Sequence, residues 1–337
     1  MLSSLSTRWL RFSKLTTLAI IASLVALALV GCSDSESSSS SESQSSSAAT
    51  ETTTKLVLSG TIFPVYDIVR QIAGDKADVS LLLAPGESPH TFNMTPSVQQ
   101  AISESAIVFG IGEGLDEWIV DSDNYVVLTS GIELRGWSGE DDHDDDKKHD
   151  DDDDHDDHDH HGHDHSGADP HYWLAPLNAI QMANNVAAEL KRIDPENASY
   201  YEANLVTFTE GLETLQAELA ELAEAVHDDA FITLHDAWYY FADAFDLNLV
   251  GSFEPTGAEE PSPRYLKKLA DTVEEHDVHA IFSEPQLSTS SLKGFASDYG
   301  LEIAVLDPLG GVDSRDSYQA LLRYNIETLV ETLDHDH

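Results

Sequence analysis

The sequence has one cysteine and few basic residues. Cys32 stands alone, and 17 Lys and Arg face 62 Asp and Glu, which gives a formal net charge of -45 over 337 residues. A lone cysteine excludes an intrachain disulfide, so the fold must rest on its apolar cores and a tight metal site must use histidine and carboxylate. The negative charge repels nucleic acid and anionic membrane surfaces, which makes cations the natural partners. Neither a G-x-x-x-x-G-K-S/T phosphate loop nor an H-E-x-x-H metalloprotease motif occurs.

The N-terminal residues have the layout of an export signal. In residues 1–31, basic residues precede the apolar stretch Leu15–Val30, as in a secretory signal peptide. Cys32 follows Leu-Val-Gly, a pattern that resembles the bacterial lipobox, in which the cysteine is lipidated; a cysteine without this role is the alternative. Residues 32–54, rich in Ser, Thr, Glu and Ala, are interpreted as a flexible tether. We therefore expect an extracytoplasmic protein, in the periplasm or at the cell surface, with a lipid anchor at Cys32.

Short apolar runs separated by helical or loop segments indicate parallel strands covered by helices. Four runs precede Asp141 and four follow Asp229, so the chain is predicted to form two α/β halves. The eight runs are Lys55–Ser59, Asp78–Leu83, Ala106–Ile111, Tyr125–Thr129, Phe231–Leu234, Leu247–Phe253, His279–Ser283 and Glu302–Leu306.

A single long helix is predicted between the two halves, over residues 196–227. Apolar residues from Tyr201 to Val226 recur at spacings of four and three, and Pro195 suits the start of a helix. The same pattern would also suit a coiled-coil dimer, because periodicity cannot say whether the partner of the stripe is another chain. We expect a monomer in which the helix joins the two halves.

An insertion at residues 141–165 contains 14 Asp, 2 Lys and eight histidines and lacks hydrophobic residues. Such a segment cannot form a core, and it is predicted to be a disordered loop. Its imidazoles and carboxylates suggest an auxiliary, weak metal-binding loop that captures or buffers metal; an acidic surface loop with incidental affinity is the alternative. The loop histidines are His143, His149, His155, His158, His160, His161, His163 and His165.

Six histidines lie outside this loop and the C-terminal tail, and two of them follow predicted strands. His90 lies in the loop after the second run and His235 ends the fifth, at strand ends where open parallel sheets bind ligands. His171 follows the acidic loop, and Asp307 and Glu284 end two further runs. One such histidine is usually an ordinary surface residue, but the set is typical of a zinc site, which takes about four ligands. The other three match no ligand motif and are interpreted as surface or cap residues: His227, His276 and His279.

Four motifs in order resemble those of one family, the metal-binding solute-binding lipoproteins of ABC importers, in the zinc-uptake branch of periplasmic, high-affinity zinc-binding proteins. The likeness extends from about Lys55 to the C-terminus. Ala175 and Asn93 depart from the family pattern, where Asp and Glu are frequent, at positions that do not ligate metal directly. The motifs are Gly86–His90, Asp169–Leu174, Leu234–Phe241 and Leu306–Gly310.

The resemblance implies that His90, His171 and His235 bind the metal, with Asp307 as fourth ligand or as a neighbour competing with water. Glu284 is expected to lie behind the ligands and to orient one of them, not to bind the metal itself. Manganese-binding relatives have a carboxylate at the position of His235, so this residue favours Zn2+. The implied function is to capture Zn2+ and deliver it to a membrane permease driven by a cytoplasmic ATPase, and the protein is not expected to be an enzyme.

The implied fold has two Rossmann-like lobes with parallel sheets, joined by one rigid helix, with the metal in the cleft between them. The N-terminal lobe covers residues 55–195, the linking helix 196–227 and the C-terminal lobe 228–337. Three other functions stay open: a manganese-binding member of the family, a surface adhesion lipoprotein, and a zinc hydrolase, the last disfavoured because no catalytic motif accompanies the histidines.

Overall fold

The computed structural model describes residues 55–119, 122–136, 167–254, 262–290 and 292–334. The predicted signal peptide, Cys32, the tether and the His/Asp-rich loop lie outside these residues, and their predictions stay untested. Within the described ranges, no helix is both long enough and apolar enough to cross a membrane.

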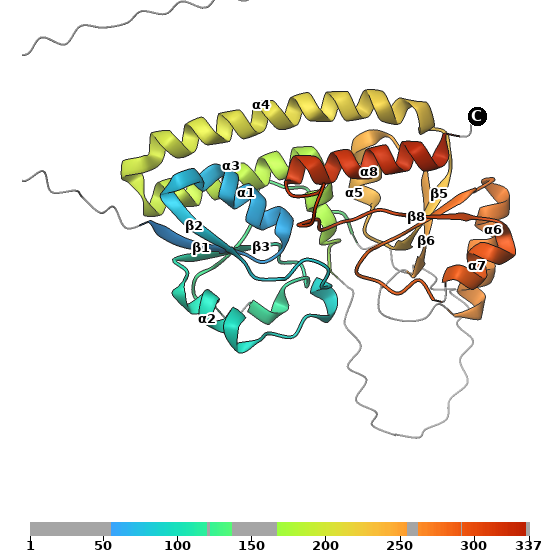
Figure 1. Cartoon of the computed structure of the whole chain (residues 1–337), viewed down its shortest axis with the longest axis horizontal. Helices are drawn as coiled ribbons and strands as arrows, with labels where there is room; N and C mark the ends of the chain where they lie inside the picture. The colour runs from blue at the N-terminus through green and yellow to red at the C-terminus, as the bar shows by residue number, and fades with distance from the viewer. Residues whose placement is uncertain (1–54, 120–121, 137–166, 255–261, 291, 335–337) are drawn as a thin grey trace, which may run out of the picture. The chain divides into compact units, whose positions relative to one another are not determined.

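Two four-stranded parallel sheets organise the described residues (Figure 1). The strand order is β2-β1-β3-β4 in the first sheet and β6-β5-β7-β8 in the second, so both halves have the same topology. The predicted α/β class with two parallel sheets is confirmed, and each of the eight apolar runs overlaps a strand. The strands are β1 (Leu56–Gly60), β2 (Ala77–Leu81), β3 (Ile107–Gly110), β4 (Tyr125–Val127), β5 (Phe231–His235), β6 (Leu249–Glu254), β7 (Ala280–Ser283) and β8 (Glu302–Val305).

The helices begin where local sequence predicts that they should. Pro occupies one of the first two positions of several helices, where its missing N–H costs nothing. Thr95, Ser262 and Ser317 accept backbone hydrogen bonds in the first turn of α2, α6 and α8. The helices are α1 (Phe63–Ala73), α2 (Pro96–Glu104), α3 (Pro176–Ile193), α4 (Ala198–Ala223), α5 (Tyr239–Phe245), α6 (Pro263–Glu275), α7 (Leu292–Tyr299) and α8 (Tyr318–Leu333).

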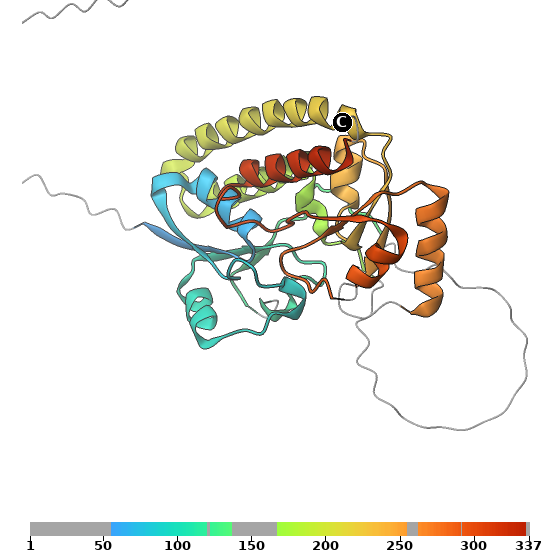
Figure 2. The ribbon, with the colours of Figure 1, turned by 45° about the vertical axis from the view of Figure 1, so that its right-hand side comes forward.

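The long helix α4 packs against elements of both halves. It contacts α1 and α3 beside the first sheet and α5 beside the second, and α8 lies alongside it (Figures 1 and 2). The apolar stripe predicted for this helix is buried at Tyr201, Leu205, Phe208, Leu212, Leu215 and Leu219. These residues belong to one continuous apolar core that also contains residues of β1, β5 and α8. The two halves are therefore joined by shared packing as well as by the chain, and the described residues form one compact unit.

Hydrogen bonds between buried groups tie the halves together beneath α4. Asp67 of α1, with no exposed surface, accepts a hydrogen bond from the backbone N–H of Tyr318 at 2.8 Å. Tyr318 begins α8, so the Asp67 carboxylate satisfies one of the unpaired N–H groups at a helix N-terminus. The Tyr318 hydroxyl donates to the carbonyl of Trp173, whose Nε1 donates to the carbonyl of Pro308 at 2.8 Å. Segments remote in the sequence, α1, the turn at Trp173 and the start of α8, are thus hydrogen-bonded to one another.

We expect Asp67→Ala to lower the free energy of unfolding by about 2–4 kcal/mol, because it leaves the Tyr318 N–H and the Arg70 guanidinium without their buried acceptor. Urea denaturation of the metal-free protein measures this. Asp78→Ala is the matched control: the Asp78 side chain is 71% exposed and pairs with Lys55, so its loss should change stability by less than about 0.5 kcal/mol. Equal effects of the two substitutions would contradict the role given to Asp67.

Candidate metal centre

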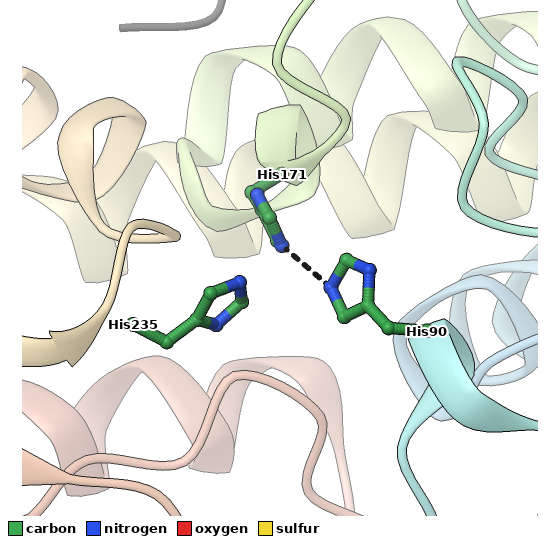
Figure 3. A group of neighbouring side chains, drawn as sticks. All are labelled: His90, His171 and His235. Carbon is green, nitrogen blue, oxygen red and sulfur yellow. Dashed lines mark hydrogen bonds between the residues drawn. The ribbon is translucent and has the colours of Figure 1, made fainter. Parts of the chain in front are cut away.

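Three histidines from separate segments of the chain converge in one pocket. His90 lies in a 3-10 turn at Pro89–Thr91 after β2, His171 begins the turn His171–Leu174, and His235 is the last residue of β5. One ring nitrogen from each lies within 4.8 Å of the other two, and the rings point toward one another (Figure 3). They line a single pocket together with Trp173 and Pro308.

The spacing of the rings suits a small cation. The Nε2 atoms of His90 and His171 are 3.4 Å apart. Two imidazole nitrogens bound to the same tetrahedral zinc at 2.0–2.1 Å would be about 3.3 Å apart. Ring centroids are separated by 5.5 Å for His90 and His171, 5.1 Å for His90 and His235, and 4.9 Å for His171 and His235. In the metal-free protein one of the Nε2 atoms of His90 and His171 donates a hydrogen bond to the other, and a bound cation would take the place of that proton.

A carboxylate orients the His171 ring. His171 Nδ1 lies 2.8 Å from Asp169 Oδ1, and the His171 backbone N–H donates to the same oxygen. Because an ionised carboxylate can only accept, Nδ1 carries the proton and Nε2 keeps its lone pair for the pocket. Burial lowers the pKa of His171 well below its ordinary value, and the charge of His235 lowers it further. Burial also raises the pKa of Asp169 to about 6, so this carboxyl is ionised at neutral pH.

A second carboxylate orients the His235 ring in the same way. His235 Nδ1 lies 3.2 Å from Glu284 Oε1, which also accepts from Trp238 Nε1 at 2.9 Å. The opposite nitrogen, His235 Nε2, is buried and has no hydrogen-bond partner among the described residues. Burial disfavours the charged ring, but the charge and hydrogen bond of Glu284 outweigh it and raise the pKa of His235 above its ordinary value. A buried imidazole nitrogen with an unused lone pair is a ligand position.

The topology explains why these two groups meet. In the second sheet, strand order reverses between the neighbours β5 and β7. His235 ends β5 and Glu284 directly follows β7, so both lie at the carboxyl edge on either side of this switch point, where open α/β sheets bind ligands.

The structure brings Asp307 near the pocket but leaves it out of the group of converging atoms. Asp307 Oδ1 accepts from the backbone N–H groups of Leu309 and Gly310, both at 3.0 Å, and Oδ2 pairs with Arg315 at 3.1 Å. Its assignment as fourth ligand stays a prediction. Glu284 lies behind His235, and the loop histidines lie outside the described residues. His227, His276 and His279 lie at the surface, away from the pocket residues.

Sequence reasoning missed two residues that the structure places at the centre. Asp169 entered the sequence analysis only as the first residue of the motif Asp169–Leu174, although its position two residues before His171 suits a carboxylate that turns back onto the ring. Gln286, two residues after Glu284, lines the same pocket. Neither has a signal in composition or periodicity, because both contacts depend on the path of an irregular segment.

Two parallel α/β halves with converging imidazoles between them define a class of proteins, the two-lobed solute-binding proteins with a buried cation site. A family model described as zinc-uptake complex component A, periplasmic, matches residues 59–332. The chain belongs to this family. Its resemblance to the zinc-uptake branch, inferred from four motifs, is thereby confirmed.

Individual relatives agree with this assignment. The chain is 29% identical over 292 residues to the high-affinity zinc uptake system protein ZnuA of Bacillus subtilis (strain 168), covering 83% of this chain and 88% of that one. It is 26% identical over 285 residues to the manganese-binding lipoprotein MntA of Halalkalibacterium halodurans, covering 83% and 88%. A crystal structure of a zinc-bound ZnuA deletion mutant superposes with a TM-score of 0.70 at 26% identity, covering 84% of this chain and 100% of that one.

We expect Glu284→Gln to weaken metal binding about 10- to 100-fold, because a side-chain amide can donate to His235 Nδ1 and thereby favour the tautomer with a protonated Nε2. Competition against a chromophoric zinc chelator measures the change. Glu302→Gln, the same substitution at an exposed position on β8, is the control and should leave affinity unchanged. An unaltered affinity in Glu284→Gln would show that this carboxylate does not orient a ligand.

Proposed function

We propose that this protein captures zinc outside the cytoplasm and delivers it to a membrane permease for import. The observation that carries the proposal is the convergence of three imidazoles on one pocket, with His171 and His235 buried and each held by a carboxylate at Nδ1. Carboxylates bound to the far nitrogen of a metal-binding histidine fix its orientation and raise its basicity. His90, His171 and His235 are the proposed ligands.

The donor set favours zinc over manganese. Three ring nitrogens suit zinc, whereas manganese prefers sites rich in carboxylate and water oxygen. Both carboxylates nearest the rings, Asp169 and Glu284, are occupied by the Nδ1 positions of His171 and His235. The curated relatives include both zinc- and manganese-binding proteins, so the nitrogen-rich site is the feature that selects between them.

The proposed role is binding and release rather than catalysis. Since the sequence carries no phosphate loop, the energy for import must come from a partner, which we take to be the ATPase of an ABC permease. A lipid anchor at Cys32, on a tether of residues 32–54, would hold the protein near that permease. The same proposal divides the chain into an N-terminal lobe that ends at residue 195 and a C-terminal lobe that begins at residue 228, with the linking helix between them.

The His/Asp-rich loop, residues 141–165, is proposed to capture or buffer metal near the pocket. The described residues flanking it support this. Gly136 and Ala168 form an antiparallel bridge, and Asp169, which orients His171, follows directly. Arg135 pairs with Asp243 of α5 at 2.7 Å, which fixes the base of the loop beside the second half.

Metal competition on the purified protein tests the proposed function. We expect zinc to be preferred over manganese. His235→Ala removes a ligand, so it should weaken zinc binding by more than the 10- to 100-fold expected when an orienting carboxylate is disturbed. His279→Ala, an exposed histidine, is the matched control and should bind as the unmodified protein does. His235→Glu should shift preference toward manganese. A manganese preference in the unmodified protein would overturn the zinc assignment.

Zinc affinity should fall as pH falls, with an onset above pH ~6.5, the ordinary imidazole value. The pKa of His235 is raised, so in the metal-free protein this ring gains a proton at higher pH than a free histidine, and zinc must displace it. Below that pKa the apparent affinity should drop by about tenfold per pH unit. The pKa of His171 is lowered, so this ring stays available throughout.

Zinc titrations between pH 5.5 and 8.5 measure the onset. In Glu284→Gln, which removes the charge that raises the pKa of His235, the decline should begin at lower pH. An onset that is unchanged in this variant would contradict the assignment of the displaced proton to His235.

A further inference from the structure

An amide side chain lies in the wall of the histidine pocket. Gln286 lines the same pocket as His90, His171 and His235, on the segment that follows β7. It is not one of the three histidines whose ring nitrogens converge. It also does not hold the Nδ1 atom of His171 or of His235, which bond to Asp169 and Glu284. Leu287 and Leu309 complete the wall around it.

The orientation of this amide is determined by its neighbour. Gln286 Nε2 donates to Asp307 Oδ1 at 3.1 Å. A carboxylate that pairs with an arginine only accepts, so the end of the amide facing Asp307 must be the NH2 group. The other end, Oε1, is buried and has no hydrogen-bond partner among the described residues. Because a buried acceptor without a donor is costly, this oxygen is expected to meet a donor that the chain itself does not supply.

The bonds of Asp307 are concentrated on one of its two oxygens. Oδ1 accepts from Gln286, Leu309 and Gly310, and Oδ2 pairs with Arg315. Since each carboxylate oxygen offers about two acceptor positions, Oδ1 is fully used, and a metal bound to Oδ2 would share that oxygen with Arg315.

We propose that Gln286 completes the zinc site through water: its Oε1 accepts a hydrogen bond from a water molecule that is the fourth ligand, and Asp307 positions the amide for this. The inference rests on the proposed zinc binding. Three imidazoles leave one of the usual four positions open, and a water polarised by the cation is a strong hydrogen-bond donor. A neutral amide holds this water without adding charge, so the fourth ligand remains exchangeable when the metal is passed on.

Substitution of Gln286 in the full chain tests the first half of the proposal. Gln286→Met keeps an unbranched side chain and removes the amide acceptor. We expect zinc to bind about tenfold more weakly in chelator competition, with the melting temperature of the metal-free protein unchanged. Gln99→Met, the same substitution at an exposed position of α2, is the control and should bind within twofold of the unmodified protein. Equal affinity in Gln286→Met and the unmodified protein would overturn the proposal.

Cobalt reports on the fourth ligand directly. With Co2+ in the site, Gln286→Met should shift the visible d–d bands, because the field of the water ligand changes, whereas Gln99→Met should not. A residue that only stabilised the fold would lower affinity without moving these bands. An unshifted spectrum in Gln286→Met would therefore count against the proposal even if affinity fell.

A double-mutant cycle tests the role of Asp307. If Asp307 acts by positioning Gln286, then Asp307→Asn should weaken zinc binding in the unmodified protein but add little in Gln286→Met. If Asp307 binds zinc itself, the loss should be as large in both backgrounds, and the proposal fails. Should Asp307→Asn not fold, Arg315→Met, which disturbs the same carboxylate from its other side, takes its place in the cycle.

Failure of this inference can be told from failure of the proposed function. His235→Ala is measured beside the Gln286 variant. If the unmodified protein binds zinc and His235→Ala does not, but Gln286→Met binds as tightly as the unmodified protein, the three-histidine site stands and the water-holding role of Gln286 is wrong. If the unmodified protein does not bind zinc, both are wrong.

Discussion

The whole site depends on a fixed separation between the two halves of the chain. His90 belongs to the first sheet, His235 ends a strand of the second, and a displacement of either by an ångström would change the 3.4–4.8 Å spacing that suits one cation. One continuous core beneath α4 and the bond from Tyr318 to Asp67 hold this separation. Close-packed cores resist small deformations, so the protein presents a preformed site. Rigid halves imply that metal enters and leaves with modest motion rather than with wide opening.

Within this frame, buried carboxylates decide what the imidazoles can do. Asp169 and Glu284 each hold an Nδ1 proton, which leaves the Nε2 atoms of His171 and His235 facing the pocket, where that of His171 lies 3.4 Å from His90 Nε2. Their effects on protonation differ: burial lowers the pKa of His171, whereas at His235 burial is outweighed by nearby carboxylates, with Glu284 first among them, and the pKa is raised. One ring is thus ready for metal over a wide pH range, and the other exchanges a proton for it. The same two carboxylates are kept from binding the metal themselves, which preserves the nitrogen-rich character of the site.

Several features followed from local sequence patterns. The eight strand runs, the two-half division and the apolar stripe of α4 are periodic signals, because a strand or helix buries one face at a fixed repeat. His90 and His235 were singled out by motifs at strand ends and His171 by a motif after the acidic loop, and the structure brings these three together. Asp307 also ends a strand run, yet it turns to backbone N–H groups and Arg315, because the loop after β8 folds back over it. Position at a strand end thus indicates proximity to a site but not which partner a side chain takes.

The sequence by itself determined the class of fold, the candidate histidines and the acidic, cation-attracting character of the chain, since these depend on composition and on short-range order. Only the tertiary structure decided which nitrogen of each buried ring faces the pocket, that Asp169 and Glu284 are the groups behind them, and that Gln286 has a buried oxygen without a donor among the described residues. The physical reason is that a hydrogen bond is set by distances of a few tenths of an ångström between segments remote in the chain. Residue spacing carries no record of such distances, whereas the packed halves define each of them.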